Sequence, residues 1–141
     1  PVVLMHSRAT PGTMQKNPAY ENVVDEVETE LRVAVDMFVA REVRRQNLVL
    51  DPGIGFAKRL EDNLALLAGL EQLSAVGLPL LVGTSRKSFV GAITGREVDQ
   101  RLYGTLGSVA AAFVKGCTFF RVHDVAATAD MLSVLSRVLG R

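Results

Sequence analysis

The chain has 141 residues, of which 48% are hydrophobic, and this is enough for one domain with a substantial core. Its formal net charge of +1 gives no strong field for nucleic acid, and no apolar stretch approaches the roughly 20 residues that a membrane-spanning helix needs. The single cysteine, Cys117, cannot form an intramolecular disulfide. We therefore expect a globular, cytoplasmic protein without nucleic-acid or membrane partners.

Four apolar runs of strand length are spread over the chain. They lie at residues 2–5, 48–50, 80–82 and 118–122. Because these runs are short and do not alternate with polar residues, they predict strands that are buried on both faces.

Apolar residues recur at helical spacing after each strand. In the first such stretch, Asn17 is a candidate N-cap, with Pro18 at the first helical position. Gly77 with Pro79, and later Gly116, are typical helix ends. The predicted apolar faces consist of Val24, Val27, Leu31, Ala34 and Phe38; Leu64, Leu67, Leu70 and Leu73; Phe89 and Ile93; Leu102, Leu106, Val109 and Phe113; and Met131, Leu135 and Val138.

The order of these elements is a strand followed by a helical stretch, four times over. Strands that are joined by helical crossovers pair in parallel, with their carboxyl ends at one edge of the sheet. Ligands of such α/β folds bind at that edge. The carboxyl ends of the four strands are therefore the place to look for a site.

The second strand leads into an acidic residue and a glycine-rich loop. Asp51 ends the apolar run, and the residues that follow it, Pro52, Gly53 and Gly55, stop the strand and leave the backbone open to a ligand. A carboxylate at this position can accept hydrogen bonds from an amide-like N–H and an exocyclic amine, as on a purine or pterin edge. The alternative is that Asp51 only caps the strand and that the glycines only form turns.

The third strand leads into the turn at residues 85–88, which holds two cations and two hydroxyls before a short helix. Free backbone N–H groups at a helix start favour an anion, so this turn is a candidate anion site. A solvated basic turn with a serine cap is the alternative. Gly83, just before the turn, permits close approach of a planar ligand or simply relieves crowding.

The fourth strand carries Arg121 and His123, two residues apart. On an extended segment both side chains project from the same face, while Phe120 and Val122 point the other way. Because an unpaired arginine is costly to bury, this pair suits phosphate oxygens or the face of a flat ring. His6, at the end of the first strand, has an equally good interpretation as a packed histidine.

Three further residues have simpler interpretations. Met5 and Phe56 are candidates for the wall of an aromatic ligand's site. Cys117 has no adjacent base and no metal-ligand spacing, so we interpret it as an inert core residue.

Five segments of the chain together closely resemble dihydropteroate synthase, in the same order and with similar spacing. They are Leu4-Met5-His6; Thr10-Pro11-Gly12-Thr13-Met14-Gln15; Leu50-Asp51-Pro52-Gly53-Ile54-Gly55-Phe56; Val82-Gly83-Thr84-Ser85-Arg86-Lys87-Ser88-Phe89; and Arg121-Val122-His123-Asp124-Val125. The resemblance implies a TIM (β/α)8 barrel. It also implies the condensation of 6-hydroxymethyl-7,8-dihydropterin pyrophosphate with p-aminobenzoate, which gives 7,8-dihydropteroate and pyrophosphate in folate biosynthesis.

The resemblance implies a pterin site at the strand ends. Asp51 is expected to hold the amino-pyrimidine edge of the pterin, and Lys87 to contact its polar edge. Arg121 is expected to lie against the pterin face, with Met5 and Gly83 flanking the ring.

The resemblance also implies sites for the two other parts of the reaction. Arg121 and His123 are expected to bind pyrophosphate, and Ser88 to help receive the p-aminobenzoate carboxylate in a pocket lined by Phe56 and Lys87. The catalytic group is then Lys87, Arg121 and His123. Mg²⁺ is expected to arrive on the substrate pyrophosphate, and no metal ligand is expected in this chain.

The resemblance covers four of the eight strands of such a barrel, which takes about 250 residues. Residues 1–141 are expected to be the C-terminal half, with the N-terminal half and its loops absent, and to be inactive or nearly so alone. The outer strands near Val2 and Phe119 are expected to expose unpaired edges and apolar faces. We therefore expect a homodimer or pairing with an N-terminal half.

Two other interpretations stay open at this point. One is a pterin- or folate-binding module of a methyltransferase, and the other is a non-catalytic paralogue of dihydropteroate synthase. The cationic residues at 86–87 and 121–123 favour pyrophosphate and an arylamine acid over a methyl carrier.

Overall fold

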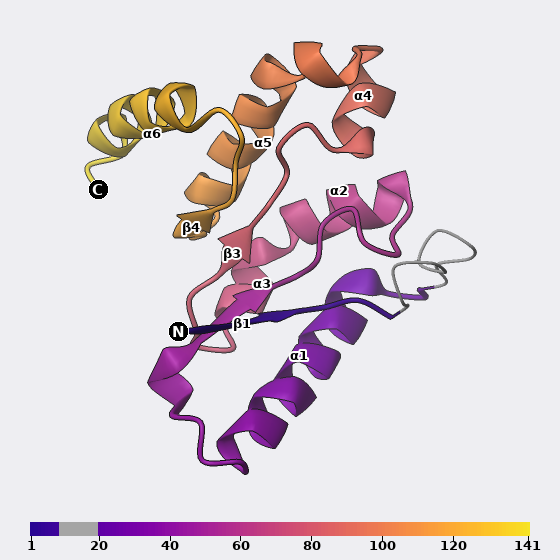
Figure 1. Cartoon of the computed structure of the whole chain (residues 1–141), viewed down its shortest axis with the longest axis vertical. Coiled ribbons are helices and arrows are strands. Elements are labelled where there is room, and N and C mark those ends of the chain that lie inside the picture. Colours follow the sequence, from indigo (N-terminus) through magenta and orange to yellow (C-terminus); the bar gives the residue numbers. More distant parts are fainter. Residues whose placement is uncertain (9–19) are drawn as a thin grey trace.

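The computed structural model describes residues 1–8 and 20–141, and within them four parallel strands follow one another in space in their chain order (Figure 1). β1 (Val2–Met5) pairs with β2 (Leu48–Asp51), and β3 (Leu81–Val82) pairs with β4 (Phe119–Phe120). A parallel bridge between Leu50 and Leu80 joins the two pairs, and the Leu50 amide donates to the Pro79 carbonyl at 2.9 Å. The predicted α/β fold with parallel strands is confirmed.

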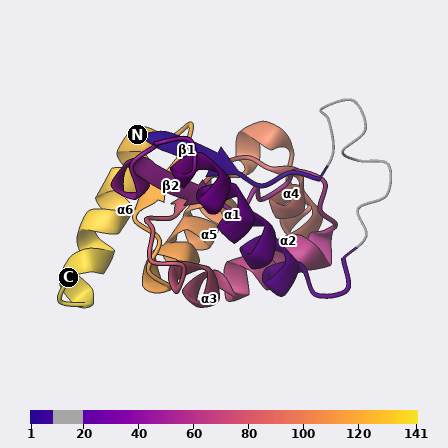
Figure 2. The ribbon, with the colours of Figure 1, turned by 90° about the horizontal axis from the view of Figure 1, so that it is seen from below.

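Helices connect the strands and cover them. In Figure 1, α1 occupies the lower part of the molecule and α4 and α5 the upper part, so the β/α units succeed one another along the long axis. Seen from below, β1 and β2 run along the upper side and α2 and α3 lie beneath them (Figure 2). The helices are α1 (Val23–Val39), α2 (Leu60–Ala68), α3 (Leu70–Ser74), α4 (Ser88–Thr94), α5 (Leu102–Val114) and α6 (Val125–Val138), with 3-10 turns η1 (Arg45–Asn47) and η2 (Val98–Gln100).

The core lies between the inner strands and the first helices. Leu48 and Leu50 of β2 and Val82 of β3 are fully buried. They form one cluster with the apolar face of α1 and the leucines of α2 and α3. Burial of this apolar face stabilises the fold by roughly 25 cal/mol for each Å² removed from water.

The helix starts and faces differ from the sequence prediction at several places. Helix α1 begins at Val23 with Asn22 as its N-cap, whereas the predicted cap Asn17 and Pro18 lie outside the described residues. The predicted second helix is two helices that meet at Gly69. Within α2 the buried face is formed by Asn63, Leu66 and Leu67, and Leu64 is 42% exposed.

The last helix has a weaker buried face than its periodicity predicts. Met131 and Leu135 are half-buried against the rest of the chain, but Val138 is 75% exposed. Helix α6 packs mainly on α5. None of the described helices is long and apolar enough to cross a membrane.

Candidate functional site

A cavity of about 480 Å³ opens at the carboxyl ends of the strands. All the predicted site residues line it except Ser88, which is exposed at the first position of α4. The residues that line the cavity are Val3, Met5, Asp51, Phe56, Leu81, Gly83, Ser85, Lys87, Arg121, Val122 and His123. The fold therefore collects side chains from all four strand ends in one place.

The loop after β2 holds Asp51 at the floor of this cavity. The Gly53 amide donates to Asp51 Oδ1 at 2.7 Å, which fixes the carboxylate. Gly53 has a φ of 68°, and a Cβ there would lie 2.0 Å from the His6 carbonyl oxygen. Only glycine fits this turn without moving the first strand end.

The charge of Asp51 is set by opposing influences. Burial, the largest of them, raises the pKa of this carboxyl above its ordinary value, while the Gly53 amide and the cations Lys87, Lys58 and Arg121 lower it. The carboxylate therefore sits in a half-buried, cation-rich site. In such a site, charge-assisted hydrogen bonds to a ligand's N–H groups gain strength from the low local dielectric.

Lys87 lines the same cavity as Asp51 and packs against Phe56. Its Nζ donates to the Ile54 carbonyl and lies 4.2 Å from the centre of the Phe56 ring. Burial lowers its pKa, and Asp51 counteracts that shift. Lys87 and Phe56, which come from two different loops, thus form one wall.

The second cation of this turn, Arg86, points elsewhere. Its guanidinium makes two contacts with Asp124, at 2.8 Å from Nη2 to Oδ1 and at 3.2 Å from Nε to Oδ2. Arg86 is absent from the cavity lining. The prediction of a turn with two cations facing an anion is therefore wrong for Arg86, because this residue ties the β3–α4 turn to the loop after β4.

Arg121 and His123 both line the cavity, as the spacing predicts. The segment is anchored by the Arg121 amide, which donates to the Val82 carbonyl at 3.1 Å, and by Ser85 Oγ, which lies 3.1 Å from the His123 amide and 2.8 Å from its Nδ1. Val122 also lines the cavity, although strand alternation predicts that it points away. The reason is that β4 ends at Phe120, so the two-residue period does not continue.

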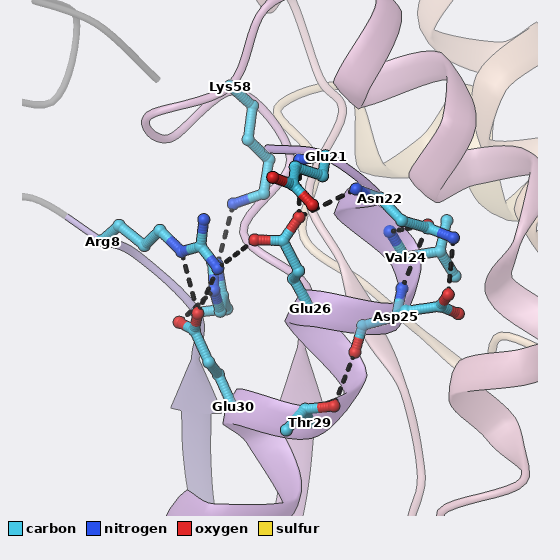
Figure 3. Close-up of polar contacts among 10 residues, drawn as sticks. Arg8, Glu21, Asn22, Val24, Asp25, Glu26, Thr29, Glu30 and Lys58 are labelled. Atoms are coloured by element: carbon cyan, nitrogen blue, oxygen red, sulfur yellow. Dashed lines mark hydrogen bonds and ion pairs between the residues drawn. The ribbon is translucent and has the colours of Figure 1, made fainter. Parts of the chain in front are cut away.

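A polar cluster with His6 and Lys58 at its buried end contacts the β2–α2 loop, and the sequence reasoning missed it. Lys58 Nζ lies 3.0 Å from His6 Nδ1 and donates to the Phe56 carbonyl at 3.0 Å. His6 Nε2 lies 2.9 Å from Glu30 Oε2, and Arg8 bridges Glu30 and Glu26 of α1 (Figure 3). His6 is therefore a packed histidine in this cluster.

Lys58 and Asn63 each form a hydrogen bond with the backbone of the β2–α2 loop. Burial lowers the pKa of Lys58 to about 8, and the nearby charge of Asp51 partly opposes this shift. Asn63 Oδ1 accepts from the Gly55 amide at 2.6 Å. A lysine and an asparagine downstream of a glycine-rich loop are the only sequence signals of this support, and neither reveals its partner.

The chain has an α/β fold with parallel strands. A cleft at the strand ends brings a carboxylate together with several cations. This combination is typical of an enzyme-like ligand-binding domain. Residues 1–123 match the model of the family described as pterin binding enzyme, and the chain belongs to that family.

Within this family the chain is similar to dihydropteroate synthases. It is 43% identical to that of Haemophilus influenzae over 95% of this chain and 49% of the relative. The structure of Yersinia pestis dihydropteroate synthase with a sulfonamide drug superposes with a TM-score of 0.97 at 36% identity, over 99% of this chain and 51% of that one. The Xanthomonas albilineans enzyme in complex with 7,8-dihydropteroate superposes at 0.92 and 40% identity, over 100% and 50%. The chain spans about half the length of the relatives it matches.

Proposed function

We propose that this chain is the C-terminal half of a dihydropteroate synthase barrel, and that it supplies much of the pterin and anion site. The observation that carries the proposal is the single cleft that joins Asp51, Lys87, Arg121 and His123 at the strand ends. It is supported by a structural neighbour that binds 7,8-dihydropteroate, a molecule with both a pterin and a p-aminobenzoate part.

In this proposal the floor of the cleft binds the pterin. Asp51, which lines the cavity and has one oxygen held by the Gly53 amide, accepts hydrogen bonds from the amino-pyrimidine edge. Lys87 contacts the polar edge of the ring. Met5, Gly83 and Arg121 flank its two faces.

The rim of the cleft holds the groups that react. Arg121 and His123 bind the pyrophosphate, and Phe56 with Lys87 lines the arylamine pocket. Ser88, the exposed first residue of α4, helps to receive the p-aminobenzoate carboxylate. The amine nitrogen of p-aminobenzoate attacks the methylene carbon, the bond from that carbon to the pyrophosphate oxygen breaks, and the nitrogen loses a proton. The cleft accelerates this displacement by positioning both substrates and by stabilising the charge of the leaving pyrophosphate.

We propose that Mg²⁺ arrives with the substrate pyrophosphate. Among the described residues there is no group of three or more His, Cys, Asp or Glu side chains placed to hold a metal. Mg²⁺ would neutralise the departing pyrophosphate charge beside Arg121 and His123.

The two outer strands are the proposed contacts with the rest of the barrel. β1 exposes Val2, Val3 and Met5, and β4 exposes Phe119. Four more β/α units between these edges would complete the eight strands of a (β/α)8 barrel. A second copy of this chain is the other proposed partner, either across these edges or as the second subunit of a dimer.

The test is product formation by a reconstituted protein, in which this chain is co-produced with the N-terminal half of the Haemophilus influenzae relative. We expect 7,8-dihydropteroate from the reconstituted protein and little or none from the chain alone. Turnover by the chain alone at the rate of an intact enzyme would contradict the half-site proposal. No product together with no binding of inorganic pyrophosphate would favour a folate-binding module of a methyltransferase. No product with normal pyrophosphate binding would favour a non-catalytic paralogue.

A further inference from the structure

The turn that presents Lys87 to the cleft has an unusual backbone. Arg86, the residue before Lys87, has a φ of 58°, in the left-handed region that side chains other than glycine and asparagine rarely adopt. Such a conformation persists only where the surroundings hold it in place. The Arg86 amide donates to Thr105 Oγ1 at 3.1 Å, and Thr105 is fully buried in α5.

Arg101, at the N-cap of α5, holds the carbonyl side of the same turn. Its Nη1 donates to the Arg86 carbonyl at 3.0 Å and, more weakly, to the Lys87 carbonyl at 3.4 Å. Its Nε donates to the Arg96 carbonyl at 2.9 Å. The rigid fork of a guanidinium suits this arrangement, since one planar group bonds carbonyls on both sides of it.

Gly91 makes room for this contact. It lies inside α4, where alanine would favour the helix. Outside its own helix backbone, the three atoms nearest to a Cβ at this position would all belong to Arg101: Nη2 at 2.3 Å, Cζ at 2.5 Å and Nε at 2.6 Å. The closest clashes of a side chain at Gly91 would therefore be with one residue, Arg101.

We propose that Arg101 is a positioning residue for Lys87. It locks the backbone of residues 86–87 so that Lys87 Nζ stays over Phe56 and against the Ile54 carbonyl. Gly91 leaves the room that the Arg101 guanidinium needs to reach these carbonyls. The functional part of the proposal rests on the proposed pterin site, because it assumes that Lys87 contacts the bound pterin.

The contact itself is tested by a double-mutant cycle on the melting temperature of the chain, with Gly91→Ala and Arg101→Ala. We expect Gly91→Ala to lower the melting temperature when Arg101 is present and to raise it in the Arg101→Ala background, where the space is free. The matched control is Gly107→Ala in α5, where a Cβ has no atom within 4 Å. It should raise the melting temperature in both backgrounds. An equal effect of Gly91→Ala in both backgrounds would overturn the contact.

The positioning role is tested by calorimetry on the reconstituted protein with 6-hydroxymethyl-7,8-dihydropterin pyrophosphate. Arg101→Ala should weaken binding about tenfold, which corresponds to the loss of one positioned, charge-assisted hydrogen bond. In a Lys87→Met background the same change should have no further effect. Affinity for inorganic pyrophosphate, which depends on Arg121 and His123, should stay unchanged, as should both affinities in the control Arg137→Ala.

The outcomes separate the two proposals. If Arg101→Ala weakens both ligands equally, or weakens pterin pyrophosphate binding as much without Lys87 as with it, Arg101 supports the fold only and the positioning role is wrong. If the unaltered reconstituted protein does not bind pterin pyrophosphate, the proposed function fails, and the positioning role toward a pterin fails with it. The melting-temperature cycle still decides whether Gly91 and Arg101 are coupled.

Discussion

The inner strands, β2 and β3, differ sharply from the outer strands, β1 and β4, in how deeply their side chains are buried. β2 and β3 are covered on both sides, and the loops that follow them are tied down by buried groups such as Lys58 and Thr105. β1 and β4 have a neighbour on one side only within the described residues, and their side chains are largely exposed.

The same division runs through the site. Asp51 and Lys87, at the ends of inner strands, are fixed by contacts inside the chain. Met5 and Arg121, at the ends of outer strands, are exposed. The difference indicates that contacts within the chain fix the side chains at the floor of the cleft, whereas Met5 and Arg121 at its walls are more exposed.

The largest expected effect on the free energy of unfolding comes from shortening a valine on an inner strand, compared with the same change on an outer strand. Val82 of β3 is 0% exposed and Val3 of β1 is 46% exposed. Val82→Ala should lower the free energy of unfolding by about 2 to 3 kcal/mol, because it removes two buried methyl groups and leaves a cavity. Val3→Ala should cost less than about 0.5 kcal/mol. Urea denaturation of the chain measures both, and equal costs would mean that β1 is covered after all.

A smaller effect concerns the charge of Lys58 in the inner region. Its pKa in the folded chain is about 8, below the ordinary 10.5, so the unfolded state binds its proton more tightly. Its contribution to stability is therefore full above about pH 10.5 and is lost as the pH falls through about 8. Urea denaturation across this range should show the unaltered chain gaining stability with pH relative to Lys58→Met. Parallel pH profiles of the two proteins would show that the charge of Lys58 is not penalised by burial.

The smallest effect is expected on α6, next to the outer strand β4. Val134 is 65% exposed, so Val134→Ser should change the free energy of unfolding of the chain by no more than about 0.5 kcal/mol. The matched control is Val109→Ser in α5, where the residue is fully buried and a hydroxyl would lack its hydration. A loss at Val134 comparable to that at Val109 would place α6 in a covered interface and remove the contrast between inner and outer parts.

The sequence was sufficient to predict the order of the strands and most of the cleft, although β4 ends at Phe120, two residues before the predicted end. Asp51, Lys87 and Arg121 each follow an apolar run, and the parallel order of the strands brings such positions to one edge. Each of these residues is recognised from its own short stretch of sequence, and the rule that parallel strands bring their carboxyl ends to one edge holds for α/β folds in general.

The parts that could not be predicted depend on contacts between distant residues. Nothing near Arg86 in the chain says that its partner is Asp124, and nothing near His6 points to Lys58 and Glu30. Likewise, the stripe that includes Leu64 is regular in sequence, but the face of α2 that packs on the core is that of Asn63, Leu66 and Leu67, and Leu64 is 42% exposed. Periodicity indicates which residues can share a face, and packing decides which face is covered.

The most direct test of the account is the affinity of the reconstituted protein for 6-hydroxymethyl-7,8-dihydropterin pyrophosphate, compared between the unaltered chain and Asp51→Asn. The substitution is nearly isosteric and replaces one hydrogen-bond acceptor with a donor. We predict that it weakens binding by about 1 to 3 kcal/mol, while leaving the affinity for inorganic pyrophosphate unchanged. An unchanged affinity for the pterin pyrophosphate would contradict the account and leave Asp51 as no more than the cap of its loop.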